Sequence, residues 1–342
     1  MEWGLRSNSN SDGIIMAAYT GIQGQNILIV SSDPANPTEG QIWYNTTSNL
    51  LKGYQLVVAN TWASGGNLNT ARYGMGNAGT QTANMAFGGA APITTAVENY
   101  NGTSWTNGTS LPATVQYNGS SGTQTAALSI GGYNGTTYNN NITQEWDGSA
   151  WTSGGNLNTG RGGLGFGIVG LQTAGLAVAG QTGPGAADNE SESYNGTSWT
   201  NTPTLNTNRA FHAAWGSTTG AIAVGAPGGN FGTAVESWNG SSWTASTSYP
   251  TAIESSAGFG TSYIDGVTIN GNTPGGKSAA CSIWNGSSWT AAGSMATARS
   301  TMGASGNTTA GLAIGGVTDP AIVANTEEYT GSSVQTRTIT TS

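Results

Sequence analysis

The chain has 342 residues, a formal net charge of −8 and a pI near 4.4. Its eight Lys and Arg residues are too few for an extended basic patch, which makes nucleic acid and anionic membranes poor partners. No stretch approaches the roughly eighteen apolar residues of a transmembrane helix, so no membrane insertion is expected.

The composition favours an all-β protein. Charged residues make up 7% of the chain and 55 residues are glycine, whereas an average globular domain is roughly 25% charged. This mixture suits many short strands joined by turns better than it suits helices. Gly and Ser enrichment also marks disorder, but twelve Trp and twelve Tyr at regular positions argue against it. The single cysteine, Cys281, is expected to pack as a small apolar residue.

Residues 1–60 lie outside any repeat. Residues 27–30 form a short apolar run, and residues 40–45 and 50–58 predict two strands joined by a turn. The first residues show no basic segment followed by an apolar one, so no secretory signal is expected. Residues 33–54, DPANPTEGQIWYNTTSNLLKGY, resemble a short module of tailed-phage virion proteins that often precedes a fibre or binding domain. The resemblance implies that residues 1–60 attach the chain to other virion proteins.

A nine-residue pattern organises the rest of the chain. It combines an aromatic residue, Asn-Gly or Asp-Gly, and a Trp, and it occurs at residues 98–106, 144–152, 192–200, 236–244 and 282–290. A decayed copy at residues 327–336 has Val334 in place of Trp. Asn-Gly is a strong hairpin signal because both residues tolerate the positive φ of a type I′ turn. Each copy therefore predicts two antiparallel strands and a tight turn. Asn-Gly-Thr is also a glycosylation sequon, but turn chemistry already accounts for these residues.

The tryptophans recur at a nearly constant interval. Trp62, Trp105, Trp151, Trp199, Trp243 and Trp289, followed by Val334, are separated by 43, 46, 48, 44, 46 and 45 residues. A period of this size with strand and turn content is typical of a propeller. In every repeat a glycine closes an apolar run. Ten or eleven residues after each Trp stands one of Arg72, Gln116, Arg161, Arg209, Glu254 and Arg299.

This order of Arg, apolar run with glycine, Glu-x-Tyr and Trp resembles the kelch repeat over residues 62–334. The resemblance implies four strands per blade and a six-bladed β-propeller over residues 61–342. Counting the strands of residues 40–58 as a blade would give seven. We expect the strand holding Trp62 to close the ring beside residues 327–330, because Trp62 has the spacing of an outer-strand Trp to the next linker. The tail after Val334 would then be peripheral.

Arginine and glutamate occur together in four repeats. The pairs are Arg72 with Glu98, Arg161 with Glu192, Arg209 with Glu236, and Arg299 with Glu327. In the other two repeats both are replaced, by Gln116 with Gln144 and by Glu254 with Ser282. Because an unpaired buried charge is costly, this joint loss predicts a hydrogen-bonded ion pair within each blade. A catalytic role is the alternative, but an active site is usually singular and this pattern repeats around the ring.

Signals for catalysis, metals or cofactors are weak. His212 is the only histidine, so a histidine-rich metal site is excluded and a Ser-His-Asp triad would depend on this one residue. The aspartates lack the spacing of a calcium loop, and the Gly-rich runs lack the lysine of a phosphate loop. We therefore expect no enzyme, no catalytic or metal-binding residues and no cofactor.

The loops between the second and third strands of the repeats vary most, and they share a face with the linkers between repeats. They carry off-pattern residues, namely Tyr133, Tyr138, Asp188, Glu190, Phe231 and Lys277. Variable loops on a rigid scaffold are where binding usually resides, so these residues are the candidate binding site. The alternative is that the loops vary because nothing constrains them.

Together these patterns predict a structural protein of a phage virion, tail-fibre-like or decorating the surface, and oligomeric in the extracellular particle. The propeller would bind a host-surface glycan or protein. A secreted or surface-attached bacterial adhesin that binds carbohydrate is the alternative, and a propeller enzyme such as a glycan hydrolase or lyase has less support, since fold alone does not set function.

Overall fold

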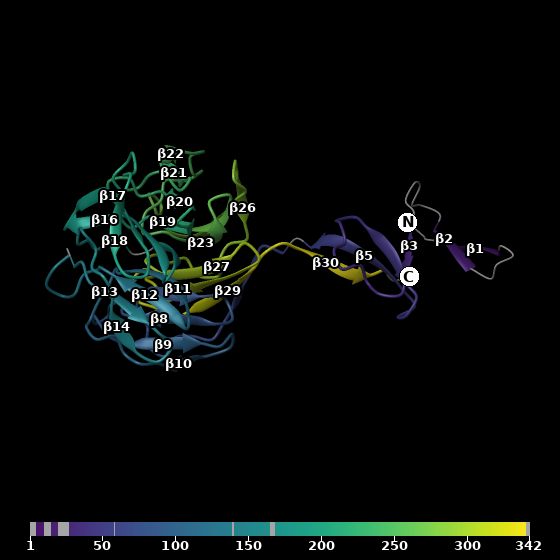
Figure 1. The fold of residues 1–342 in the computed structure, drawn as a ribbon, viewed down its shortest axis with the longest axis horizontal. Helices are drawn as coiled ribbons and strands as arrows, with labels where there is room; N and C mark the ends of the chain where they lie inside the picture. Colours follow the sequence, from purple (N-terminus) through teal and green to yellow (C-terminus); the bar gives the residue numbers. More distant parts are fainter. Residues whose placement is uncertain are drawn as a thin grey trace. The chain divides into compact units, whose positions relative to one another are not determined.

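In the computed structural model the described residues are 5–9, 15–19, 27–57, 59–138, 140–164 and 168–339. Every helix or strand assigned among them is a β-strand. The chain divides into two compact units (Figure 1). One is Asn60–Gly331, and the other combines Met1–Ala59 with Ser332–Ser342.

Asn60–Gly331 contains six four-stranded antiparallel sheets, which we call blades. The first two are β7 (Gly76–Gly79), β8 (Asn84–Phe87), β9 (Val97–Tyr100), β10 (Trp105–Asn107) and β11 (Gly119–Thr123), β12 (Ala126–Ile130), β13 (Thr143–Trp146), β14 (Trp151–Ser153). The next two are β15 (Ile168–Leu171), β16 (Ala174–Gly183), β17 (Ala186–Tyr194), β18 (Trp199–Thr202) and β19 (Ala213–Ser217), β20 (Gly220–Val224), β21 (Val235–Trp238), β22 (Trp243–Ala245). The last two are β23 (Ala257–Ser262), β24 (Asp265–Thr273), β25 (Gly276–Trp284), β26 (Trp289–Ala292) and β27 (Gly303–Asn307), β28 (Ala310–Ile314), β29 (Thr326–Thr330), β6 (Thr61–Ser64).

The first strands of the blades surround a common axis. Each contacts the next in the order β7, β11, β15, β19, β23 and β27, and β27 contacts β7 again. In Figure 1 the yellow strand β27 lies beside the blue strands of the first blade. The unit is therefore a β-propeller, as the sequence predicted. The second strands, such as β20 and β28, are buried almost throughout because neighbouring blades cover both of their faces.

The Asn-Gly hairpins differ from the predicted type I′ turn. Tyr100 pairs with Trp105, so the loop between them has four residues. Asn101 Oδ1 accepts hydrogen bonds from the amides of Thr103 and Ser104, both at 2.9 Å. Within this loop only Gly102 has a positive φ, of 89°. Asparagine is thus required for its side-chain acceptor rather than for a left-handed backbone.

The ring closes as the sequence predicted. Trp62 on β6 pairs with Tyr329 on β29, and their ring centroids are 5.2 Å apart. The expectation of a peripheral tail within the propeller is wrong, because Val334 on β30 (Ser333–Thr338) pairs with Leu56 of β5 (Leu50–Val57) in the other unit. With β6 already beside β29, the tail finds no free edge there, whereas β5 offers one.

The smaller unit contains the sheet β3-β4-β5-β30, in which β3 (Leu28–Val30) runs parallel to β4 (Ile42–Asn45). The strands of residues 40–58 belong to this sheet and lie outside the propeller unit. A second sheet pairs β1 (Leu5–Ser9) with β2 (Ile15–Tyr19). The division between the units falls at Asn60, next to the boundary drawn from the sequence, and residues 332–339 belong to the smaller unit.

All four Arg–Glu pairs are formed and buried. The N–O distances are 3.1 Å for Arg72–Glu98, 2.8 Å for Arg161–Glu192 and 2.9 Å for Arg209–Glu236, and Arg299–Glu327 is also paired. In the fourth blade Arg209 also donates to the carbonyls of Gly225 and Ala234, both at 2.8 Å. Glu236 accepts the amide of Asn206 at 2.7 Å. Each such pair ties the linker entering a blade to the third strand of that blade.

The two repeats without the Arg–Glu pair differ in what occupies the space of the missing side chains. In the fifth blade Tyr249 takes the linker position that holds Leu or Met elsewhere. Its buried hydroxyl donates to Asn270 Oδ1 at 2.6 Å. In the second blade a cavity of about 60 Å³ lies beside Gln144 and Leu111. The joint replacement is thus compensated by an aromatic ring in one blade and leaves a void in the other.

Removing β6 should open the ring. A chain of residues 60–331 keeps β6 beside β29 and should melt as one transition close to that of the propeller in the full chain. A chain of residues 66–331 differs from it only in lacking the segment that contains β6. This shorter chain should melt at a much lower temperature, because β29 is left with a free edge. Differential scanning calorimetry of the two truncations checks this, and equal melting temperatures would contradict closure by β6.

Breaking a buried ion pair should cost more than breaking an exposed one. Arg209→Ala leaves the Glu236 carboxylate buried without its partner and should lower the free energy of unfolding by about 3 kcal/mol. Lys277→Ala is the control, because Lys277 pairs with Asp319, whose side chain is 75% exposed. Its loss should cost less than about 1 kcal/mol. Urea unfolding measures both, and similar small losses would mean that the buried pairs contribute little.

Candidate functional site

One end of the propeller is formed by the linkers that enter the first strands and by the loops between second and third strands. We call this end the linker face. In the third and fifth blades its loops are extended hairpins, made by β16 with β17 and by β24 with β25. Elsewhere the loops are irregular. This face holds the off-pattern residues that the sequence singled out.

A ring of left-handed residues lies where the linkers enter the first strands. Their φ values run from 46° to 59°, and they are Gly74, Tyr117, Gly163, Phe211, Ser255 and Thr301. Backbone hydrogen bonds join them from blade to blade. Tyr117 N donates to Gly74 O at 2.6 Å, and Phe211 N donates to Gly163 O at 3.1 Å. Left-handed tyrosine and phenylalanine are unusual and cost about 1–3 kcal/mol each, so these rings are held in place by the surrounding structure.

Three aromatic side chains gather at this ring, and we call Tyr73, Tyr117 and Phe211 the aromatic cap. The ring centroid of Tyr117 lies 5.3 Å from that of Phe211 and 6.0 Å from that of Tyr73. A Cβ at Gly74 would lie 2.7 Å from the ring of Tyr117, so glycine leaves room for it. All three cap residues are half-buried. Burial, with Tyr73 and Tyr138 nearby, raises the pKa of Tyr117, which keeps its hydroxyl protonated and able to donate.

The predicted residues Tyr133 and Tyr138 stack on one another in the loop of the second blade. Their centroids are 4.4 Å apart and their planes differ by 22°. Tyr138 also contributes to the raised pKa of Tyr117, so the stacked pair adjoins the aromatic cap. Both tyrosines are half-buried. The structure therefore brings these two predicted residues together, next to aromatic residues that the sequence reasoning missed.

Asp188 and Glu190 converge on Arg161 in the third blade. Their carboxylates lie 3.8 Å and 3.7 Å from Arg161 Nη1, while Glu192 accepts a hydrogen bond from Nη2 at 2.8 Å. One guanidinium thus faces three carboxylates. The side chains of Asp188 and Glu190 are 18% and 40% exposed. Glu190 in particular keeps acceptor capacity toward solvent.

The other two predicted residues lie apart from these groups. Phe231 is 43% exposed in the loop of the fourth blade. Lys277 lies on the hairpin of the fifth blade, where its ammonium contacts Asp319 at 2.6 Å. Of the missed residues, Tyr117 and Phe211 could have been noticed, because other repeats carry Gly, Ser or Thr at their position.

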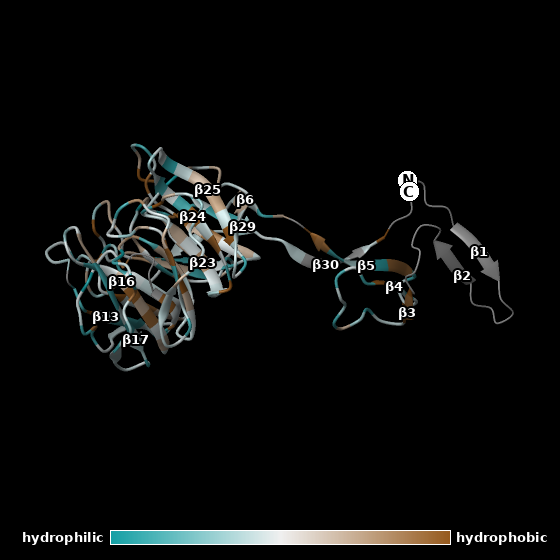
Figure 2. Ribbon diagram, turned by 90° about the horizontal axis from the view of Figure 1, so that it is seen from above, coloured by the Kyte–Doolittle hydropathy of each residue, from teal (hydrophilic) through white to brown (hydrophobic). Residues whose placement is uncertain are grey.

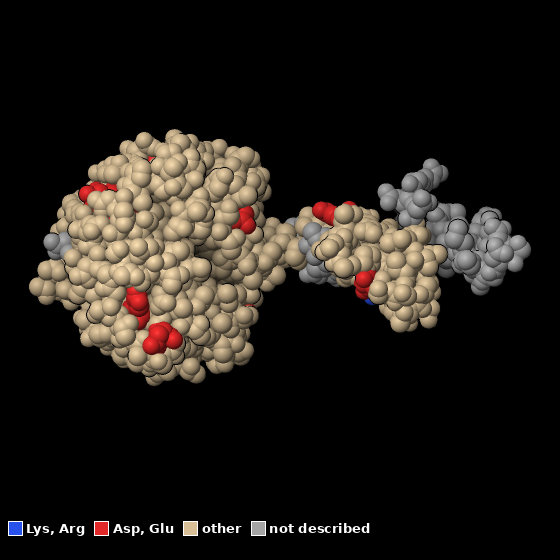
Figure 3. Space-filling view, in the orientation of Figure 1, with Lys and Arg blue, Asp and Glu red and all other residues tan. Residues whose placement is uncertain are grey.

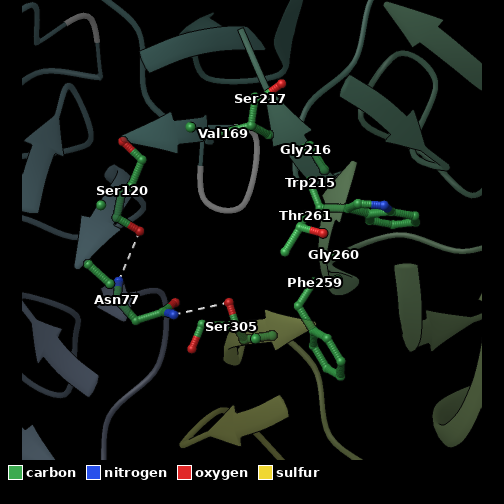
Figure 4. A pocket seen from close by; sticks show the side chains of 18 of the residues that line it. Asn77, Ser120, Val169, Trp215, Gly216, Ser217, Phe259, Gly260, Thr261 and Ser305 are labelled. Atoms are coloured by element: carbon green, nitrogen blue, oxygen red, sulfur yellow. Dashed lines mark hydrogen bonds between the residues drawn. The ribbon is translucent and has the colours of Figure 1, made fainter. Parts of the chain in front are cut away.

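A cavity of about 340 Å³ lies along the axis, lined by the later residues of all six first strands (Figure 4). Its polar side chains are uncharged and include Asn77, Ser120, Ser217, Thr261 and Ser305. The backbone amide of Asn77 donates a hydrogen bond to Ser120 Oγ at 2.9 Å, which links the first two blades across the cavity wall. The residues that line this cavity carry no acid or base, so the cavity is suited to holding a small neutral molecule or water.

The single histidine and the single cysteine, His212 and Cys281, are both buried. Burial, with the charge of Arg209, lowers the pKa of His212 to about 3, so the imidazole is neutral. Burial also raises the pKa of Cys281 to about 12, which leaves an unreactive thiol. Among the described residues no cluster of His, Cys, Asp or Glu could hold a metal ion. None of those residues belongs to a helix long and apolar enough to cross a membrane.

Replacing His212 should flatten the dependence of stability on pH. The unfolded chain takes up a proton near pH 6.5, whereas the folded chain does so only near pH 3. Stability should therefore fall as the pH drops from 6.5 toward 3, by about 2 kcal/mol between pH 6.5 and pH 5. His212→Met, which copies Met75 and Met302 at this repeat position, should remove that loss. Urea unfolding at pH 7 and pH 5 checks this, and parallel losses in both proteins would contradict it.

Comparison with known proteins supports the fold. No protein-family model matches the chain, and no curated protein matches it. Among solved structures, the chain is similar to the structure of YjhT, with a TM-score of 0.59 and 13% sequence identity. The match covers 80% of this chain and 100% of YjhT. At this identity the likeness shows a shared β-propeller fold.

Proposed function

We propose that this chain is a structural protein of a tailed-phage virion, a tail-fibre-like or surface-decorating subunit that presents its propeller to the host. The smaller unit would attach to other virion proteins, and the linker face would contact the host surface. The kelch-like order of the repeats supplies the rigid scaffold. The observation that carries the proposal is the organisation of residues 33–54.

These residues form one hydrogen-bonded module around Asp33. Asp33 Oδ1 accepts from Trp43 Nε1 at 3.0 Å and from Asn45 Nδ2 at 2.7 Å, and Oδ2 accepts from Lys52 Nζ at 2.6 Å. The hydrogen bond from Lys52, with those from Trp43 and Asn45, lowers the pKa of Asp33 to about 2. The residues that carry the resemblance to phage virion proteins are therefore the residues that hold the module together. This supports a shared module over a chance match of composition.

The sheet of this unit exposes apolar side chains. Leu28 is 45% exposed, Ile29 50%, Leu50 39% and Leu56 46%, and Figure 2 shows brown stretches in β3 and β5. Within the sheet, β3 is an edge strand of three residues. Exposed apolar surface next to a free strand edge favours association with another chain. We propose that virion proteins, including copies of this chain, cover it.

The alternative is a secreted or surface-attached bacterial adhesin that binds carbohydrate. It would use the same linker face but a different attachment. A propeller enzyme acting on glycans is a third possibility, which would need a carboxylate poised as an acid or base. Asp188 and Glu190 instead lie 3.8 Å and 3.7 Å from Arg161 Nη1 in an ion-pair cluster, and this supports binding over acid catalysis.

The proposal predicts that the chain is present in purified phage particles and that Asp33 controls its incorporation. Asp33→Ala removes the acceptor of three hydrogen bonds and should greatly reduce the amount of the chain in particles, while the melting transition of the propeller persists. Ser48→Ala, at an exposed position of the same module, is the matched control and should be incorporated normally. Quantitative mass spectrometry of purified particles measures this. Absence of the unaltered chain from particles, with its presence on a bacterial cell surface, would favour the adhesin.

A further inference from the structure

Resting on the proposed function, we infer that the ligand of the linker face is an uncharged glycan rather than an anionic surface polymer. The inference comes from charge and from the side chains that this face offers. Both are properties of the propeller unit alone.

Among the described residues of the propeller, every Lys and Arg is engaged with a carboxylate, so none is free to hold an anionic ligand. Of the eight cationic and sixteen acidic residues in the chain, five and twelve lie in residues 60–331, which gives this unit a net charge of −7. Its four arginines are 0–1% exposed and engaged with glutamates. Lys277, its single lysine, contacts Asp319. The view in Figure 3 shows separate red patches and no blue on the propeller.

The net negative charge of the propeller disfavours the binding of polymers rich in phosphate or carboxylate. Like charges repel during approach, and no guanidinium or ammonium is available to offset the lost hydration of a bound phosphate. Arg161 is not an anion site either, because three carboxylates already surround its guanidinium. An anionic ligand there would have to displace those carboxylates.

The side chains present fit a neutral hydroxylated ligand. Tyr133, Tyr138 and the aromatic cap offer partly exposed aromatic side chains, and the tyrosines among them combine an apolar body with a polar tip. The C–H surface of a sugar ring can pack on such a ring, while its hydroxyls bond the tyrosine hydroxyls. In the next blade, the carboxylate of Glu190 can accept further hydrogen bonds from the hydroxyl groups of the sugar. Apolar packing with hydrogen bonds to uncharged groups is the combination that polysaccharides without acidic groups provide.

The test uses the purified full chain and host cells whose surface has been altered chemically. Periodate cleaves the vicinal diols of glycans, and protease removes surface proteins. Binding should fall at least tenfold after periodate and be unchanged after protease. Binding abolished by protease but not by periodate would overturn the inference in favour of a protein ligand, while leaving the virion role intact. No binding to untreated host cells would contradict both.

A second measurement separates neutral from anionic glycans. Affinity electrophoresis with a neutral dextran, mannan and galactan panel, and with alginate and a teichoic-acid polymer, should show retardation by a neutral polysaccharide and none by the anionic ones. Tyr117→Ala and Tyr138→Ala should weaken that retardation at least tenfold. Tyr263→Ala, an exposed tyrosine between β23 and β24, is the control and should bind normally. Retardation by an anionic polymer that weakens with added salt would overturn the inference.

Discussion

A ring of sheets must close, and the pairing of β6 with β29 is the contact on which this propeller depends. The other twenty-three strands of the six sheets would still leave an open arc if that edge were free. The chain meets the requirement by bringing residues 61–64 to strand β29, more than two hundred and fifty residues later in the sequence. The same pairing frees the chain end at Gly331, so residues 333–338 can join β5 in the smaller unit.

The buried Arg–Glu pairs connect the sheets of the ring to the linkers on the linker face. Each carboxylate accepts a hydrogen bond from a linker amide, as Glu98 does from Asn69 N at 2.6 Å. The linkers then enter the first strands through left-handed residues that bond from blade to blade. A local charge pair thus fixes the backbone from which Tyr73 and Phe211 project, whereas Tyr117 follows Gln116 in a blade without the pair. Side chains supported in this way would lose little conformational freedom on binding the proposed ligand.

Much of the fold could be predicted because six copies repeat the same spacings. The Trp period, the joint loss of Arg and Glu, and the position of Trp62 are visible only when several copies are compared. A single copy would show none of them. The turn type was mispredicted, because Asn-Gly suits a two-residue turn as well as the four-residue loop capped by Asn101 Oδ1. The partner of Val334 was missed because β5 lies far away in the sequence and outside the repeat. The aromatic cap was missed because a tyrosine at position 117, taken by itself, does not indicate a left-handed backbone. Only comparison with the Gly, Ser or Thr at this position in other repeats singles it out.

The central proposal is that ligand binds on the linker face of the closed ring. Amide hydrogen exchange of the full chain, with and without polysaccharide extracted from the host surface, tests this most directly. The account predicts slower exchange in residues 131–138 and 209–215 when the polysaccharide is bound, and no change in the turn at residues 261–265 on the opposite end. Protection of that turn, with unchanged exchange on the linker face, would contradict it.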